Sequence, residues 1–377
     1  MPGGFLQVNG VKAFETYIKE GNMERILVLN DGSVFRGKAF GSDREAFGEV
    51  CFTTAMTGYQ ELLTDPSFLG QMVVMTFPMI GNYGINRFDC EAMLPHVSAL
   101  IVREWCEQPN HFRQEKTLDE YLKKYDIPGI CGIDTRKLTR HIRSYGSIKG
   151  YLVNGDINIS AALTKLHQHH FFTNLVEQIS VKAAYEVPGP GKRVVAVDFG
   201  MKASILKNLN VMGYHVTVVP HTYTAGQILE LHPHGVLLSN GPGDPTHIPQ
   251  AAETVRDLLG VVPLFGICMG HQLLALAAGA KTVKMKFGHR GGNHPVKELT
   301  TGRLYLTAQN HGYRVEEEGL SDTGLEITHR NVNDGSIEGL RHTTEPAFGV
   351  QFHPESAPGP HDALALFQQF DRMMEGR

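Results

Sequence analysis

Residues 264–272 carry the most informative pattern in this chain, Leu264-Phe265-Gly266-Ile267-Cys268-Met269-Gly270-His271-Gln272. The first four residues predict a buried strand, and the small and apolar run that continues to Gly279 predicts a helix. Cys268 therefore falls at a strand-to-helix turn, with a glycine two residues away on each side. Because neighbours without side chains let the backbone fold sharply, this spacing predicts a turn that projects the cysteine side chain.

A cysteine at such a turn is a candidate nucleophile. The positive end of the following helix dipole favours a thiolate over a thiol, and the N–H of the next residue can bind an oxyanion. Lone cysteines are more often small buried apolar residues. The turn by itself therefore leaves a purely structural role for Cys268 open.

A candidate base and its carboxylate partner lie further along the chain. Residues 347–352 predict a strand that ends in the turn His353-Pro354-Glu355. On an extended chain, a spacing of two residues puts His353 and Glu355 on the same side, and a proline suits a strand end because it lacks the ladder donor. Cys268, His353 and Glu355 would then form a nucleophile–base–orienter triad. By itself, the histidine–glutamate pair is more commonly a surface ion pair, since the chain has 19 histidines.

Strands and helices alternate before residue 264. Predicted strands cover residues 194–198, 216–219, 236–239 and 264–267, and predicted helices begin at Lys202, Ala225 and Gln250. This alternation favours right-handed βαβ units and a parallel sheet with helices on both faces. A ligand is then expected at the carboxyl ends of the strands.

The N-terminal part is rich in predicted strands and has a different character. Strands are predicted at residues 26–29, 34–40, 50–54 and 72–77, with a hairpin at Asn30-Asp31-Gly32 and helices at residues 118–125 and 136–145. Val187-Pro188-Gly189-Pro190-Gly191 interrupts every regular pattern. We therefore expect a non-family extension over residues 1–22, an N-terminal domain over 23–187 and a second domain over 192–377.

Composition narrows the class of protein. With 377 residues, 42% apolar and 20% charged residues and a net charge of −4, the chain has the profile of a soluble globular protein with no nucleic-acid partner. The absence of a long apolar run predicts no membrane association and a cytoplasmic location. The 5 cysteines contain no CxxC pair, so neither a disulfide framework nor a metal site is expected. No GxxxxGK[ST] phosphate loop occurs either.

Four motifs in order resemble those of the class I glutamine amidotransferases. They are the stretch 266–272, Ser239-Asn240-Gly241-Pro242-Gly243-Asp244-Pro245, Gln309-Asn310-His311-Gly312-Tyr313 and His353-Pro354-Glu355. Residues 52–67, 81–84 and 132–139 also resemble the N-terminal domain of carbamoyl phosphate synthetase small subunits. The resemblance implies an α/β fold, in which a mixed β-rich α/β domain precedes an amidotransferase domain with a central, mostly parallel sheet flanked by helices.

The same resemblance implies a role for each matching residue. Cys268 would attack the side-chain amide of L-glutamine, His353 would act as acid and base, and Glu355 would orient His353. The oxyanion would be bound by the backbone N–H groups of Met269 and Gly241. The glutamine pocket would be lined by Gly243, Gln272, Asn310, Gly312 and Tyr313, and by Ser67 from the N-terminal domain.

The resemblance also implies a large subunit that forms a heterodimer with this chain and docks on its N-terminal domain. The large subunit would combine the released ammonia with bicarbonate and two ATP to make carbamoyl phosphate for arginine and pyrimidine synthesis. ATP and Mg²⁺ are expected on that subunit, and no cofactor or metal in this chain. The pathway served, higher oligomers and effectors stay open, as do two alternatives: a free-standing cysteine hydrolase and a non-catalytic subunit.

Overall fold

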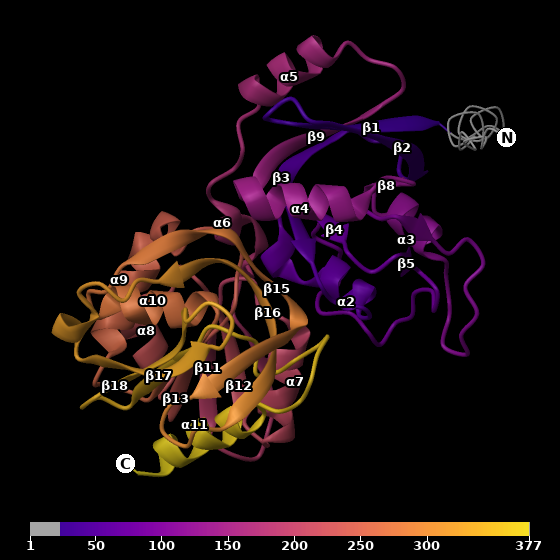
Figure 1. The fold of residues 1–377 in the computed structure, drawn as a ribbon. Helices are drawn as coiled ribbons and strands as arrows, with labels where there is room; N and C mark the ends of the chain where they lie inside the picture. Colours follow the sequence, from indigo (N-terminus) through magenta and orange to yellow (C-terminus); the bar gives the residue numbers. More distant parts are fainter. Residues whose placement is uncertain (1–22, 377) are drawn as a thin grey trace, which may run out of the picture.

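The computed structural model describes residues 23–376, so the extension expected over residues 1–22 lies outside the described part. Two β structures organise the chain, a closed barrel in the N-terminal half and a ten-stranded sheet in the C-terminal half. In Figure 1 the barrel half runs from indigo to magenta and the sheet half from dark pink to yellow. The predicted β-rich first half and α/β second half are both confirmed.

Seven strands form the barrel. They are β1 (Glu24–Leu29), β2 (Val34–Gly41), β3 (Ala46–Thr53), β4 (Gln71–Met75), β6 (Ala99–Ile101), β8 (Pro128–Cys131) and β9 (Ile148–Asn154). Their order is β1-β2-β8-β6-β4-β3-β9, and β9 pairs with β1 to close the barrel. The predicted hairpin joins β1 to β2. Gly32 in this hairpin has a φ of 86°, a backbone conformation that residues with a side chain rarely adopt.

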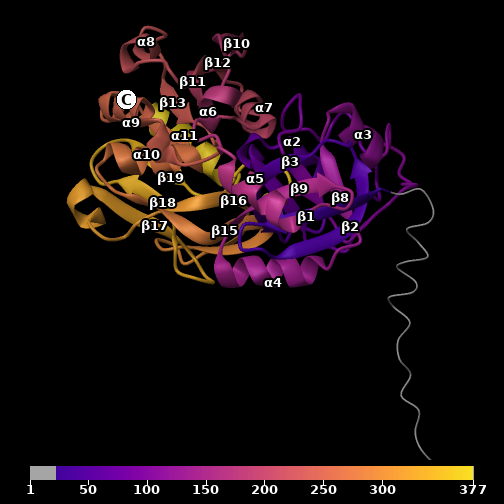
Figure 2. The ribbon, with the colours of Figure 1, turned by 90° about the horizontal axis from the view of Figure 1, so that it is seen from above.

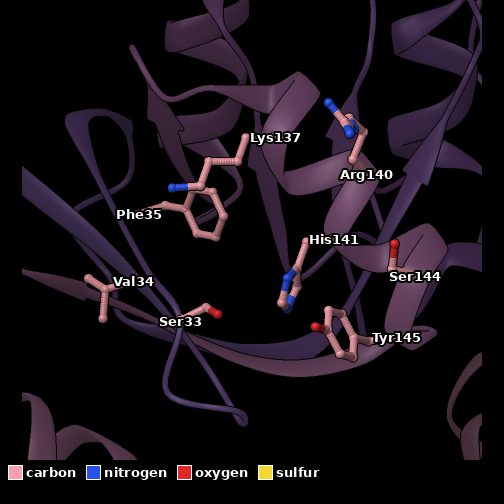
Figure 3. Close-up of a pocket in the computed structure, with 8 residues that line it drawn as sticks. All are labelled: Ser33, Val34, Phe35, Lys137, Arg140, His141, Ser144 and Tyr145. Carbon is pink, nitrogen blue, oxygen red and sulfur yellow. The ribbon is translucent and has the colours of Figure 1, made fainter.

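Short elements surround the barrel or lead from it to the second half. They are α2 (Tyr59–Thr64), η1 (Pro66–Phe68), β5 (Met79–Ile80), β7 (Glu104–Trp105), α3 (Leu118–Lys124), α4 (Thr135–Tyr145), α5 (Ile159–Gln168) and α6 (Leu175–Ile179). Val176 of α6 packs in the core of the second half. The Asp134 side chain accepts a hydrogen bond from the Lys137 N–H at 2.8 Å and so caps α4, as predicted. A cavity of about 360 Å³ lies between α4 and the β1–β2 hairpin (Figure 3), and no predicted site residue lines it.

Ten strands form the second sheet. They are β10 (Tyr185–Val187), β11 (Arg193–Asp198), β12 (His215–Pro220), β13 (Gly235–Leu238), β14 (Leu264–Ile267), β15 (Thr282–Glu298), β16 (Leu304–Val315), β17 (Leu325–Asn331), β18 (Ile337–His342) and β19 (Ala347–Val350). The central strands β12-β11-β13-β14-β19 are parallel, as predicted. The pattern did not predict the antiparallel extension β18-β17-β15-β16. β10 pairs with β12, so residues 185–187, assigned above to the first domain, lie in this second sheet.

Helices cover both faces of the parallel strands because successive side chains point to opposite sides. The helices are α7 (Ala203–Val211), α8 (Ala225–Leu229), α9 (Pro249–Leu258), α10 (Met269–Ala277) and α11 (Ala365–Glu375), with the short turns η2 (Pro245–His247) and η3 (Leu320–Thr323). Val195 and Val197 of β11 join one buried cluster with α8, α9 and α10. Val194 and Ala196 join the other cluster with α7 and α11. No helix in the described part of the chain is long and apolar enough to cross a membrane.

The two halves meet along β15. Lys284 on this strand forms an ion pair with Glu49 of β3 at 2.5 Å, and the Ser147 N–H donates to the Lys286 carbonyl at 2.8 Å. Figure 2 shows β15 and β16 reaching from the sheet half to the barrel. This contact brings the barrel turn after α2 to the edge of the sheet where Cys268 lies, as the polar contacts described below show.

Candidate active site

Cys268 lies at the strand-to-helix turn that the sequence predicts. It is the N-cap of α10, directly after β14, and its backbone has φ 54° and ψ −100°. A positive φ is uncommon and costly for a residue other than glycine. A Cβ on Gly270 would lie 2.1 Å from the Leu238 carbonyl oxygen, and a Cβ on Gly266 would lie 2.6 Å from the Gly270 carbonyl carbon. The two glycines are therefore required by close backbone contacts around the turn.

His353 and Glu355 form a buried pair next to this turn. β19 ends at Val350, so the pair lies in the turn after the strand, where the His353 N–H donates to the Ala308 carbonyl at 2.9 Å. His353 Nδ1 lies 2.7 Å from Glu355 Oε1. His353 Nε2 is buried without a hydrogen-bond partner among the described residues. The pair therefore leaves one ring nitrogen free to exchange a proton.

The charges around His353 favour its protonated form. Burial lowers the pKa of His353 most strongly, and the Lys202 ammonium lowers it further. The charge and hydrogen bond of Glu355, together with the neighbouring Cys268 thiol, outweigh both effects, so the pKa of His353 is raised. Burial raises the pKa of Glu355, whereas the Lys202 ammonium and His353 lower it, with a net value of about 2. Glu355 is thus a carboxylate and can stabilise an imidazolium on His353.

Lys202 is a residue of the site that the sequence analysis missed. It is buried, and its Nζ donates to Glu355 Oε1 at 3.0 Å and to the Ser356 carbonyl at 2.6 Å. The available signal was its position after the first parallel strand, at the carboxyl edge where ligands bind. This position indicates the edge of the sheet where a ligand binds, but it does not indicate that Lys202 contacts the predicted catalytic residues.

Two further groups contact the sulfur. Gln351 Nε2 lies 3.6 Å from Cys268 Sγ, and Cys268 Sγ lies 3.8 Å from the Asn310 carbonyl oxygen. The Gln351 Oε1 accepts from Gln272 Nε2 at 2.9 Å, which orients the Gln351 amide with its NH₂ group toward the sulfur. The sequence analysis named Gln272 and Asn310 but missed Gln351, two residues before His353.

A cavity of about 920 Å³ lies in front of Cys268. Most of the residues predicted to bind glutamine line it. They are Ser67, Gly241, Gly243, Gln272, Asn310, Gly312 and Tyr313. The Met269 side chain instead packs in the core, as the predicted role of its backbone N–H allows. His353 and Glu355 lie behind Cys268 and are at most 3% exposed.

The barrel half contributes directly to this cavity. The Ser67 Oγ accepts a hydrogen bond from Asn240 Nδ2 at 2.8 Å. Asp65 Oδ2 accepts a hydrogen bond from Asn310 Nδ2 at 2.8 Å. All four residues are buried, so the turn Asp65-Pro66-Ser67, of which Ser67 lines the cavity, is held in place by the second half.

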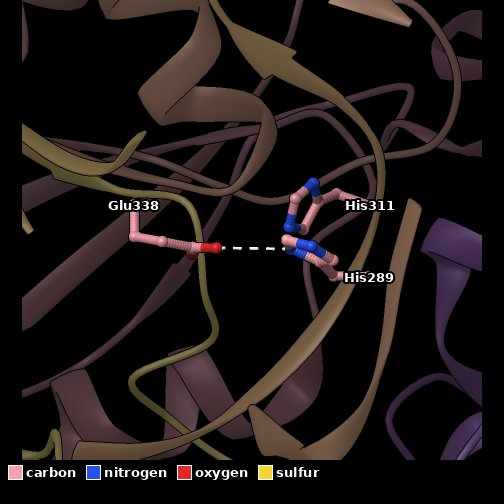
Figure 4. Close-up of side chains that lie close together, drawn as sticks. All are labelled: His289, His311 and Glu338. Carbon is pink, nitrogen blue, oxygen red and sulfur yellow. Dashed lines mark ion pairs between the residues drawn. The ribbon is translucent and has the colours of Figure 1, made fainter. Parts of the chain in front are cut away.

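A cluster of histidines lies beside the pocket on β15 and β16. His289, His311 and Glu338 offer ligand atoms within 4.8 Å of one another (Figure 4). Burial lowers the pKa of His289, but Asp334 and Glu338 outweigh it and raise this pKa to about 9. His289 Nε2 lies 2.9 Å from Asp334 Oδ2, and His311 Nε2 lies 2.8 Å from Gln309 Oε1. Because these ring nitrogens already have protein partners, we describe the cluster as a hydrogen-bonded network rather than a metal site.

Comparison with known proteins bears on both halves of the chain. Residues 27–152 match the family model of the carbamoyl-phosphate synthase small chain, CPSase domain, and residues 195–373 match glutamine amidotransferase class-I. The carbamoyl phosphate synthase small chain of Bacillus caldolyticus is 57% identical over 92% of this chain and 96% of its own length. The chain belongs to the carbamoyl phosphate synthase small chain family.

A second relative of this family is the carbamoyl phosphate synthase pyrimidine-specific small chain of Bacillus subtilis, which is 57% identical over 94% of this chain and 96% of its own length. Among solved structures, a glutamine amidotransferase from Thermotoga maritima is similar with a TM-score of 0.36 and 15% identity, over 49% of this chain and 84% of that chain. The small-chain family match therefore rests on sequence. Both matched regions contain parts of the site, Ser67 in the first and Cys268 and His353 in the second.

Proposed function

We propose that this chain hydrolyses L-glutamine to glutamate and ammonia through a thioester on Cys268, and supplies the ammonia to a large subunit. One observation supports this most strongly. In a chain of the carbamoyl phosphate synthase small chain family, a cysteine at a strained turn lies beside a buried histidine–carboxylate pair and faces a polar cavity. This combination activates a cysteine for nucleophilic acyl transfer.

The first half of the proposed reaction forms the thioester. The Cys268 thiolate attacks the side-chain amide carbon of glutamine, and the carbonyl oxygen becomes an oxyanion. The N–H groups of Met269 and Gly241 bind this oxyanion; the Met269 N–H has no acceptor within its helix because it opens α10. His353 donates a proton to the amide nitrogen, the C–N bond breaks, and ammonia leaves.

The second half releases glutamate. Neutral His353 takes a proton from water, and the resulting hydroxide adds to the thioester carbon. The C–S bond then breaks, which returns the Cys268 thiolate and an imidazolium on His353. Glu355 stays ionised throughout and holds the imidazole by its Nδ1.

The cavity is suited to an amino acid with polar groups at both ends. Gly243, with a φ of 89°, and Gly241 let the main chain approach a small substrate. The Gln272 amide NH₂ group already donates to the Tyr313 carbonyl at 2.9 Å, so its position is fixed before substrate binds. We propose that these groups, with Ser67, Asn310, Gly312 and Tyr313, bind L-glutamine.

We propose that the partner is a carbamoyl phosphate synthase large subunit, which uses the ammonia with bicarbonate and two ATP and carries the ATP and Mg²⁺ sites. The heterodimer is the unit we expect. The cavity continues past Ser67 to barrel residues such as Gln71 and Ser98, which supports a route for ammonia along the barrel half.

The pyrimidine-specific name of the Bacillus subtilis relative supports pyrimidine synthesis as one pathway served, beside arginine synthesis. All 5 cysteines are free, which suits the reducing cytoplasm that we propose as the compartment.

The decisive variant is Cys268→Ser, assayed with the purified large subunit. Glutamine-dependent carbamoyl phosphate formation should fall at least about 1,000-fold, because the thioester cannot form. Formation from added ammonia should persist, since that reaction bypasses Cys268. The proposal would be wrong if the Cys268→Ser protein still used glutamine. It would also be wrong if the wild-type protein in complex with its large subunit hydrolysed no glutamine.

A further inference from the structure

Glu91 of the barrel half contacts the start of helix α7 in the other half. Glu91 is 3% exposed, and its Oε2 accepts from the Ser204 N–H at 3.0 Å and from the Ser204 hydroxyl at 2.6 Å. The Glu91 carbonyl oxygen also accepts from the Ala203 N–H at 2.8 Å. A single barrel residue thus binds two of the first N–H groups of α7.

This contact replaces a cap that α7 lacks. The N-cap position is Lys202, whose side chain makes no capping hydrogen bond. Free N–H groups and a positive dipole end make the start of a nine-residue helix a favourable place for a carboxylate. Here the carboxylate comes from the barrel, so the position of α7 depends on the barrel half.

Lys202 connects this helix start to the proposed triad. It precedes Ala203 directly, and its Nζ binds Glu355, which in turn binds His353. Burial lowers the pKa of Lys202, but the carboxylates of Glu355, Glu91 and Asp65, in that order, together outweigh burial and raise it. The Lys202 ammonium is therefore stabilised by carboxylates from both halves of the molecule.

We propose that Glu91 is a positioning residue of the catalytic site, which holds Lys202 and thereby the Glu355 carboxylate in register with His353. The inference rests on the function proposed above. It adds a route by which the barrel half, the expected docking site of the large subunit, controls the rate of glutamine hydrolysis. Glu91 itself touches no reacting atom.

The barrel end of this connection is also well defined. The Glu91 N–H donates to the Thr64 Oγ1 at 2.9 Å, and the Thr64 hydroxyl donates to the Gln60 carbonyl at 2.9 Å. Thr64 ends α2 and precedes the turn Asp65-Pro66-Ser67, of which Ser67 lines the cavity. A displacement of α2 when a partner binds the barrel would therefore reach this turn and the triad together.

The test uses the full chain in complex with its large subunit and compares Glu91→Gln with wild type. Loss of the charge should lower the kcat of glutamine hydrolysis roughly 10- to 100-fold, the range seen when a partner of a site residue is removed. The KM for glutamine should change little, and carbamoyl phosphate formation from ammonia should stay unchanged. Because Glu355 would hold the imidazole less firmly, the pH limb assigned to His353 should move to lower pH.

A double-variant comparison separates positioning from simple destabilisation. If Glu91 acts through Lys202, Glu91→Gln combined with Lys202→Met should be no slower than Lys202→Met alone. The matched control is Asp119→Asn. Asp119 accepts from the Gly41 N–H at 2.7 Å and forms an ion pair with Lys123, and both partners belong to the barrel half. The activity of this variant should match wild type.

Additive effects of the two substitutions, or an unchanged kcat and pH profile in Glu91→Gln, would overturn the inference. If Glu91→Gln lowers the thermal midpoint below the assay temperature, Ser204→Ala, which removes one of the hydrogen bonds, takes its place with the same expected shift. A wild-type complex that hydrolyses no glutamine would instead contradict the proposed function, so the two failures are distinguishable.

Discussion

The sulfur of Cys268 has a neighbour that the triad scheme does not include. Gln351 donates toward Sγ at 3.6 Å, and its orientation is fixed by the Gln272 amide. A hydrogen bond to a charged acceptor is stronger than one to a neutral acceptor. Gln351 should therefore stabilise the thiolate form that attacks glutamine, independently of the imidazolium on His353.

The variant Gln351→Met keeps the volume of the side chain and removes the donor. We expect kcat for glutamine to fall about tenfold, the effect of losing one hydrogen bond to a charged group. Alkylation of Cys268 by iodoacetamide, measured at one fixed pH, should become slower. Gln178→Met serves as the control, because that glutamine borders the cavity at α6 and makes no hydrogen bond with the sulfur. An unchanged alkylation rate in Gln351→Met would show that the contact does not stabilise the thiolate.

Single residues also mark the limit of the sequence analysis. That Cys268 lies beside the pair His353 and Glu355 could be predicted, because each lies in a short motif with its own local chemistry. Lys202 and Gln351 could not, since nothing in a linear pattern shows which side chains reach a sulfur or carboxylate from another strand. Their roles depend on distances set by the sheet.

At the scale of elements, local chemistry predicted much of the architecture. The Asn30-Asp31-Gly32 hairpin, the Asp134 cap and the alternation of strands and helices over residues 193–267 all form as expected. The antiparallel strands β15 to β18 were missed. β15 carries glycines, charged residues and two register shifts, so it lacks the regular alternation by which strands are recognised.

Helix α2 contains a carboxyl group in an unfavourable environment. Burial raises the pKa of Glu61 to about 7, with the nearby Asp89 and Glu91 adding to the effect, and Glu61 Oε2 has no partner among the described residues. The unfolded chain has an ordinary glutamate pKa of about 4.3. Between these two values the folded state binds more protons than the unfolded state, so this group makes stability fall as pH rises toward 7.

The variant Glu61→Gln removes this ionisation. At pH 8 the free energy of unfolding should rise by about 3–4 kcal/mol, the equivalent of a shift of roughly two to three pKa units, whereas at pH 5 it should rise by only about 1 kcal/mol. Urea unfolding of both proteins at the two pH values measures the difference. Equal effects at pH 5 and pH 8 would mean that Glu61 is not titrating in this range.

At the scale of the whole molecule, the pocket belongs to neither half alone. Asp65 and Ser67 come from the barrel, whereas Asn240 and Asn310 come from the sheet, and the hydrogen bonds between them join residues 173 and 245 positions apart in the chain. Family resemblance predicted Ser67 at the pocket. The partners of Ser67 and Asp65 could not be predicted, because their contact arises only when the two halves are assembled.

The variant Asp65→Asn tests this assembly. Asn310 Nδ2 would lose its charged acceptor, and the main-chain cap of η1, in which Asp65 accepts from the Ser67 N–H at 2.9 Å, would weaken. We expect the KM for glutamine to rise about tenfold, since a hydrogen bond to a charged group contributes about 1.5–3 kcal/mol, with a smaller effect on kcat. Steady-state glutaminase kinetics of the complex give both values. A fall in kcat at constant KM would place Asp65 in the chemical step instead.

The split pocket has a consequence during protein synthesis. Domains generally fold in the order in which they leave the ribosome, so the barrel with Ser67 is formed before β19 and the turn that bears the imidazole exist. A growing polypeptide that has not reached residue 355 lacks part of the pocket and the residue proposed as proton donor. We therefore expect nascent chains to hydrolyse no glutamine before the second half is complete.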